Sequence, residues 1–150
     1  MPNWCEGTLK VRGSKEDIIN FLKNGIKPMG HFSDSEEAEI KEEEYFMIVK
    51  TGKSGFYLND SRRGFIEEDE IWFDYEQDVL ALEYKQAWGI EAHELASISE
   101  KYNVDFKIYG YERGMEFNQD IEIHKGTIIK NEEVKFKDYT WECTNPNIGG

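Results

Sequence analysis

Residues 7–25, GTLKVRGSKEDIINFLKNG, decide the fold because they join a strand pattern to a helix pattern across one short turn. Leu9 and Val11 alternate with polar residues, which predicts a strand with one buried face. Ser14 is a good helix N-cap, and Asp17 three residues later completes a short-armed capping box. An apolar stripe follows at Ile18, Ile19, Phe21 and Leu22. The stretch therefore predicts a strand, a tight turn and a helix that ends at the closing Asn-Gly pair.

Downstream, strand patterns outnumber helix patterns. Apolar runs or alternating residues predict strands at 45–50, 56–58, 71–75, 79–86 and 104–108. We expect the first of these strands to be largely buried. The spacing of Leu95, Ile98 and Tyr102 predicts a second helix over residues 90–102.

The C-terminal part is predicted to consist of hairpins. A turn at Lys125-Gly126 follows the alternating pair Ile121 and Ile123, which predicts a first hairpin. A second hairpin is expected over residues 134–141, and residues 146–150 are expected to form a frayed tail.

The central section is the most acidic part of the chain. A proline, a glycine and several short polar residues predict a loop over residues 26–44. Seven of the eleven residues from Asp34 to Glu44 are acidic, and like-charge repulsion favours an extended, solvated segment. We expect residues 1–150 to form a single domain with an acidic insertion at about 26–78.

The order of predicted elements is typical of a ferredoxin-like α+β fold. A β-α-β-β-α-β chain folds into an antiparallel sheet with two helices on one face, and the C-terminal hairpins would extend that sheet. The 39% hydrophobic and 14% aromatic fractions are too high for a disordered chain, although 33% of the 150 residues are charged.

The charge balance restricts the classes of partner. Thirty-one acidic residues against 18 basic ones give a formal net charge of −13. Because nucleic-acid affinity rests on cationic groups, this balance opposes direct DNA or RNA binding, and it opposes attachment to anionic lipid as well. It suits solubility, or docking on a basic protein surface.

The N-terminal residues and the two cysteines indicate a cytoplasmic protein. The first fifteen residues lack the apolar core of a signal peptide, and no apolar run is long enough to span a membrane. Cys5 and Cys143 are too few for a disulfide scaffold or an iron–sulfur cluster, and we expect both to be free thiols. Trp4 and Cys5 are interpreted as structural, with Trp4 covering a sheet edge, rather than as a reactive site.

Two motifs carry a resemblance to a known family. The chain opens MPNWC (residues 1–5) and continues with the alternating run at 7–13; QAWG (86–89) and YERGMEFN (111–118) follow later. Together they resemble an uncharacterised family carried by phages, plasmids and integrative elements, whose C-terminal half is described as ferredoxin-like. The resemblance covers the first 13 residues and most of 79–130. It implies a ferredoxin-like fold and a mobile-element origin, and it implies no reaction.

The acidic runs and one tryptophan are candidates for binding a partner protein. Carboxylates can occupy positions where a basic nucleic-acid-binding protein expects phosphates, and a tryptophan at a strand-to-helix turn is a rigid contact. Solvation of an ordinary surface is the alternative. The candidates are Glu42, Glu43, Glu44, Glu67, Glu68, Asp69 and Trp88.

A compact basic spot and nearby aromatic residues are candidates for binding an anion. Guanidinium groups grip carboxylate or phosphate, and sheet aromatics can stack on bases. Local neutralisation of Asp60 and of the acidic run from Glu67 to Glu70 is the alternative. The candidates are Arg62, Arg63, Tyr109, Tyr111 and Arg113.

No catalytic or metal-binding motif stands out, so we expect neither an enzyme nor a cofactor. His31, His93 and His124 lack metal-ligand spacing, and there is no nucleophile elbow, P-loop or dinucleotide-binding glycine pattern. The sequence favours an acidic protein-binding module, in its sharpest form a nucleic-acid-mimicking inhibitor of a host defence nuclease. The alternative is an accessory protein that binds a small anionic ligand or a nucleic-acid end through Arg62 and Arg63. The oligomeric state stays open.

Overall fold

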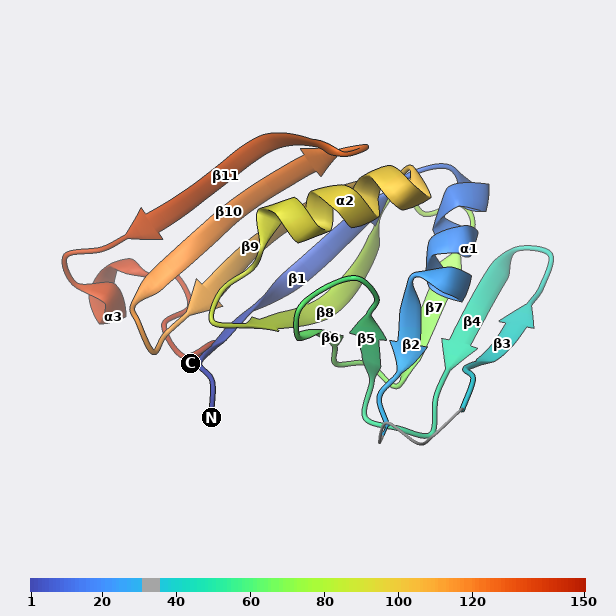
Figure 1. Ribbon diagram of the computed structural model, residues 1–150, viewed down its shortest axis with the longest axis horizontal. Helices are drawn as coiled ribbons and strands as arrows, with labels where there is room; N and C mark the ends of the chain where they lie inside the picture. Colours follow the sequence, from blue (N-terminus) through green and yellow to red (C-terminus); the bar gives the residue numbers. More distant parts are fainter. Residues whose placement is uncertain (31–35) are drawn as a thin grey trace.

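The chain folds into a mixed α+β structure with one large and one small antiparallel sheet (Figure 1). The computed structural model describes residues 1–30 and 36–150. The strands in this part are β1 (Trp4–Arg12), β2 (Ile26–Pro28), β3 (Glu39–Glu42), β4 (Phe46–Lys50), β5 (Phe56–Leu58), β6 (Gly64–Ile66), β7 (Glu70–Asp74), β8 (Leu80–Ala87), β9 (Asp105–Glu112), β10 (Phe117–His124) and β11 (Thr127–Lys135). The helices are α1 (Lys15–Asn24), α2 (Ala92–Tyr102) and α3 (Tyr139–Glu142).

The large sheet has eight strands in the order β11-β10-β9-β1-β8-β6-β5-β2. Every neighbouring pair is antiparallel, and β1 lies between β8 and β9. Leu9 pairs with Leu82, which keeps the buried side chains of both strands on the same face. The strand predicted at 7–12 therefore exists and begins earlier, at Trp4, because its first residues pair with the end of β8.

The turn and helix predicted after β1 are confirmed. The Ser14 hydroxyl accepts the Asp17 N–H at 3.1 Å, which caps α1. Gly25 ends the helix, and its N–H donates to the Phe21 carbonyl at 2.7 Å. Ile18, Phe21 and Leu22 are buried, as the apolar stripe predicts.

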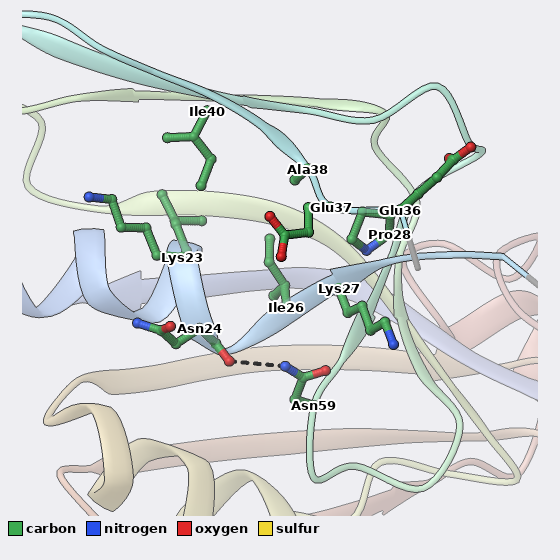
Figure 2. Close-up of a pocket in the computed structure, with 11 residues that line it drawn as sticks. Lys23, Asn24, Ile26, Lys27, Pro28, Glu36, Glu37, Ala38, Ile40 and Asn59 are labelled. Carbon is green, nitrogen blue, oxygen red and sulfur yellow. Dashed lines mark hydrogen bonds between the residues drawn. The ribbon is translucent and has the colours of Figure 1, made fainter. Parts of the chain in front are cut away.

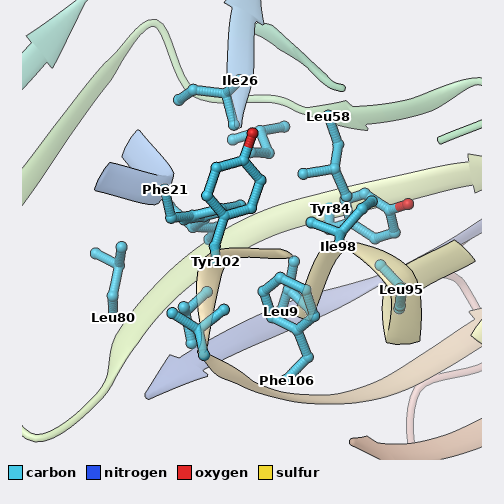
Figure 3. Packing of buried hydrophobic residues seen from close by; sticks show 14 of the residues in the cluster. Leu9, Phe21, Ile26, Leu58, Leu80, Tyr84, Leu95, Ile98, Tyr102 and Phe106 are labelled. Atoms are coloured by element: carbon cyan, nitrogen blue, oxygen red, sulfur yellow. The ribbon is translucent and has the colours of Figure 1, made fainter. Parts of the chain in front are cut away.

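Both long helices pack on the core side of the large sheet. The Phe21 ring of α1 meets Tyr102 of α2 and Phe106 of β9, each with centroids 5.7 Å apart (Figure 3). Leu95 and Ile98 of α2 point into the same cluster. No described helix is long and apolar enough to cross a membrane.

The small sheet, in the order β3-β4-β7, lies beside α1 at one end of the molecule (Figure 1). Its buried side chains belong to the same apolar cluster as those of the large sheet. The charged contact Lys23–Glu42, at 2.7 Å, also joins α1 to β3. The small sheet is thereby held against the helix layer by both apolar and charged contacts.

The loop predicted over residues 26–44 is wrong at both of its ends. Residues 26–28 form β2, where Ile26 pairs with Leu58 of β5, and residues 39–42 form β3. The acidic run is therefore partly a strand, because pairing with β4 satisfies its backbone on one side. Residues 31–35, which include His31 and Asp34, lie outside the described residues.

The C-terminal hairpin predicted over 134–141 is also wrong. Residues 139–142 form the short helix α3, in which the Asp138 carboxylate accepts the Trp141 N–H at 3.3 Å. The expected frayed tail is instead bound, because the Gly150 N–H donates to the Trp4 carbonyl at 2.8 Å. The two ends of the chain thus lie side by side (Figure 1). The hairpin predicted around Lys125-Gly126 is confirmed by β10 and β11.

Candidate functional site

The small sheet turns one face to the core and the other to solvent. Its inward side chains are Met47, Val49, Ile71 and Phe73. Strand alternation places Phe46, Ile48 and Trp72 on the opposite face. Trp72 is 57% exposed and stacks on Phe46 with ring centroids 5.4 Å apart and an interplanar angle of 22°. The expectation that residues 45–50 are largely buried is therefore wrong, because β4 buries only alternate residues.

Carboxylates stand at both ends of this aromatic pair. Asp74 is the cross-strand partner of Phe46, and the Glu43 N–H donates to the Phe46 carbonyl at 2.9 Å. At the other end the Trp72 indole N–H donates to Glu70 Oε1 at 3.0 Å. We call Phe46, Ile48 and Trp72, with the carboxylates of Glu43, Glu70 and Asp74, the outer face.

The outer face is acidic on balance. Alternation in β3 adds Glu39 and Lys41, which pair with Lys50 and Ile48 of β4. We include all the charged groups on this side of the small sheet in the outer face. They are the carboxylates of Glu39, Glu43, Glu70 and Asp74 and the ammonium groups of Lys41 and Lys50. The Lys41–Glu43 pair, at 3.6 Å, is solvent-exposed and adds little stability. The arrangement can bury aromatic surface against a partner while offering that partner acceptor oxygens.

The two acidic runs proposed as partner contacts do not meet. Glu42, Glu43 and Glu44 lie where β3 turns into β4, whereas 67–69 lie in the connection between β6 and β7. The register places Glu70, which follows that connection, opposite Lys50 at the far end of β4. The structure thus places Glu43 on the outer face and directs Glu42 toward Lys23 of α1.

The residues 67–69 have local structural partners. Glu67 pairs with Lys85, and Glu68 Oε2 accepts the Glu83 N–H at 3.2 Å. Partial burial raises the pKa of Glu68, an effect that this N–H opposes. The Asp69 carbonyl accepts the Thr51 N–H at 2.9 Å. These contacts tie the β6–β7 connection to both sheets.

Trp88 is exposed on a strained backbone. Its φ is 68°, a value that bulky residues rarely adopt, and 57% of its surface is exposed. The Trp88 N–H donates to the Asn3 carbonyl at 2.8 Å, which holds the turn between β8 and α2. Trp88 directly follows β8 of the large sheet, so it does not belong to the outer face of the small sheet.

The basic spot is divided between two environments. Arg63 lies over the Trp4 ring at 5.5 Å, and Lys85 lies 4.9 Å from the same ring centre. Phe65 packs edge-on against Trp4 at 5.5 Å. Because β1 is a central strand, Trp4 does not lie at a sheet edge. It lies on the face of the large sheet that the helices do not cover, which we call the open face. Arg62 instead pairs with Glu91 at 3.7 Å. Asp60 pairs with Lys101 and Glu67 pairs with Lys85, so Arg62 does not neutralise the carboxylates that the alternative named.

Tyr109 and Tyr111 lie on the open face of the large sheet. Their rings meet edge-on with centroids 5.2 Å apart. Together with Lys10 and Lys107 they border a shallow hollow of about 230 Å³. Arg113 lies beyond the end of β9, beside Gly150. Arg63, Tyr109 and Tyr111 lie on the open face, whereas Arg62 pairs with Glu91 at the start of α2, so the predicted anion-binding residues do not converge on a single point.

A larger hollow of about 520 Å³ separates α1 and β2 from the arm that leads into β3 (Figure 2). Ile26 and Ile40 face each other across it, and Lys27 lies opposite Glu37. At its base the Asn59 amide donates to the Asn24 carbonyl at 2.9 Å. The lining mixes apolar, acidic and basic groups, so it matches no single class of ligand.

The Cys5 thiol lies in the apolar core of the protein. Cys5 is fully buried, and burial, assisted by the charge of Glu112, raises the pKa of its thiol to about 12. The burial of Cys5 agrees with the structural interpretation of this residue. Cys143 is buried and free as well. Within residues 1–30 and 36–150 no three His, Cys, Asp or Glu side chains are placed to hold a metal ion.

Comparison of the chain with protein-family models, with curated proteins and with solved structures found no match. Sequence inspection missed Phe46, Ile48 and Trp72 because they lie in the continuous apolar runs 45–49 and 71–73, in which no alternation marks the exposed positions.

Proposed function

We propose that this protein is a protein-binding module that docks on a basic partner through the outer face. The stacked pair of Phe46 and Trp72 carries this proposal, because a 57% exposed tryptophan stands there among carboxylates. Exposed apolar patches rimmed by polar groups mark interaction sites, and tryptophan is enriched among residues that dominate binding energy.

Charge defines the chemistry of the partner. The outer face carries four carboxylates against two ammonium groups, and the whole chain has a net charge of −13. A surface rich in Lys and Arg would meet this face with complementary potential and would be steered toward it over long range. Binding should therefore weaken as salt increases, while the aromatic contact should persist.

The specific form that we propose is inhibition of a nucleic-acid-binding protein, such as a host defence nuclease, inside the cytoplasm of a cell that carries a mobile element. The motif resemblance and the acidic charge support this form. A nuclease already presents a basic surface to phosphates, so carboxylates that occupy that surface would exclude its substrate.

We infer a ferredoxin-like core as the framework of the module. The order β9-β1-β8-β6, with α1 after β1 and α2 after β8, supports this inference. In this interpretation the remaining strands of the large sheet are additions, and the small sheet is an elaboration that displays the outer face.

The test compares which proteins of a lysate are retained by three forms of this protein. Wild-type protein, a Phe46→Ala/Trp72→Ala variant and a Trp141→Ala control are immobilised and exposed to a nuclease-treated bacterial lysate. Trp141 is 87% exposed and lies on α3, so the control variant removes a comparable exposed indole from outside the small sheet. A protein retained by wild type and control but not by the double variant supports the proposal. Capture that is insensitive to the double variant contradicts it.

The charge component has its own variant. Substituting Glu42, Glu43 and Glu44 by lysine reverses the charge of the β3–β4 turn. The substitution should weaken binding of the captured protein more at low salt than at high salt. Unchanged affinity would remove the nucleic-acid mimicry from the proposal and leave the aromatic contact.

One observation favours the alternative of anionic-ligand binding. Arg63 and Lys85 both lie over Trp4, which orients two cations on the open face of the large sheet. A nucleotide or the phosphorylated end of a nucleic acid would be the ligand. It should raise the melting temperature of wild type but not of the Arg62→Ala/Arg63→Ala variant. The absence of any nucleotide-induced shift would reject this alternative.

A further inference from the structure

The outer edge of β11 is long and unpaired. β11 spans nine residues and ends the large sheet, with β10 as its neighbour. Among the described residues, none of the backbone groups of 127–135 bonds to a loop or to a side chain. Figure 1 shows the β11 arrow along the rim of the molecule. The N–H and C=O groups that point away from β10 are therefore available to another strand.

β11 lacks some of the devices that block edge pairing. It contains neither proline nor glycine, and its bulge lies near the turn, at Ile129, because Ile128 pairs with Ile123 and Lys130 pairs with Glu122. Ile129 is 54% exposed. The opposite edge of the same sheet differs, because β2 has only three residues and ends in Pro28. β11 is thus the edge on which a further strand can pair.

The sequence of β11 is complementary to itself about Asn131. When two copies pair antiparallel with Asn131 on the two-fold axis, Lys130 of each lies opposite Glu132 of the other. These two charged cross-strand pairs stabilise an antiparallel ladder.

Neighbouring registers lose this complementarity. Two-fold pairing centred on Lys130 places two ammonium groups together, and pairing centred on Glu132 places two carboxylates together. Like charges opposite each other destabilise a strand pair. Of these three registers, only the one centred on Asn131 brings opposite charges together.

We propose that two copies of this protein associate edge to edge through β11, in a two-fold antiparallel pair centred on Asn131. The pairing joins the two large sheets into one continuous sheet. It leaves the small sheet of each copy free, because that sheet lies at the other end of the molecule (Figure 1). The dimer therefore presents two outer faces, and its formation does not depend on the function proposed for them.

The experiment exploits the reciprocal charges. Wild type, Lys130→Glu and Glu132→Lys are examined alone by sedimentation over a wide concentration range, at a salt concentration that screens the net charge of −13. We expect the wild type to dimerise and each single variant to associate at least about tenfold more weakly, because two attractive pairs become repulsive. An equal mixture of the two variants should dimerise again, since each glutamate then meets a lysine.

The mixture keeps the test independent of folding. Lys130 also pairs with Asp120 in its own copy at 2.7 Å, so a single variant alters an internal contact as well. Recovery by mixing cannot come from that contact. Lys27→Glu on β2 makes the same charge change at the other edge and should leave dimerisation unchanged. A wild type that stays monomeric at every concentration, or a mixture that fails to associate, overturns the proposal.

Discussion

Alkaline pH should destabilise this protein, because two buried groups hold their protons more tightly in the folded state than in the unfolded state. Cys5 is 0% exposed, and burial followed by the charge of Glu112 raises the pKa of its thiol from 9.0 to about 12. Burial and then the charge of Glu94 also raise the pKa of the Tyr84 phenol. Both groups are neutral when protonated, so an apolar site favours the protonated form.

The sign and the size of the effect follow from proton counting. Above pH 9 the unfolded chain releases the Cys5 proton while the folded chain keeps it, so the free energy of unfolding falls as the pH rises toward 12. One group contributes about 1.4 kcal/mol per pH unit, which gives a loss of about 3 kcal/mol at pH 11 from Cys5. Tyr84 adds about 1 kcal/mol in the same direction. Because small domains are stable by about 5–15 kcal/mol, this loss is substantial.

The assay is guanidinium unfolding under reducing conditions at pH values from 8 to 11, with wild type and Cys5→Ala compared. At pH 8 the alanine variant should be the less stable, since it loses buried contacts. By pH 11 the wild type should have lost about 3 kcal/mol more than the variant, because only the wild type has the thiol. If the free energy of unfolding fell equally with pH in both proteins, the claim that Cys5 is buried and keeps its proton at high pH would be refuted.

Three further predictions test the core and the backbone. Gly7→Ala should cost about 2 kcal/mol or more in urea unfolding, since a Cβ there would lie 2.3 Å from the Tyr109 carbonyl oxygen, whereas Gly52→Ala, with nothing within 4 Å, should cost little. Phe21→Ala should cost about 3–5 kcal/mol by the same measurement, and a smaller loss would contradict its place in the core. Trp88→Gly should leave the melting temperature unchanged or higher, because glycine adopts φ 68° without strain; a clear fall would show that the indole packs.

Local signals explain which parts of the fold could be predicted. The unit formed by β1 and α1 could be predicted because Ser14, the apolar stripe and Gly25 act within a few residues of one another. β2 and β6 could not, because each has three residues and depends on distant partners; Gly64 pairs with Gln86. For α3 a local signal existed at Asp138, but the alternation that precedes it favoured a strand.

The candidate site shows the same division. Composition directed attention to the acidic section, but charge alone could not separate Glu43 on the outer face from Glu42, which pairs with Lys23. The apolar run of 45–50 suggested burial on both faces, whereas the register with β7 leaves Phe46 partly exposed beside Trp72. Which face of a strand is covered depends on packing partners that lie far away in the sequence.

Hydrogen–deuterium exchange on the complex with the captured partner tests the central claim most directly. Binding should slow exchange in β4 (residues 46–50), in β7 (residues 70–74) and in the turn that holds Glu43. Exchange on the open face of the large sheet, around Trp4 and Arg63, should stay unchanged. Protection around Trp4 and Arg63, with none in β4 or β7, would contradict the outer face as the docking surface.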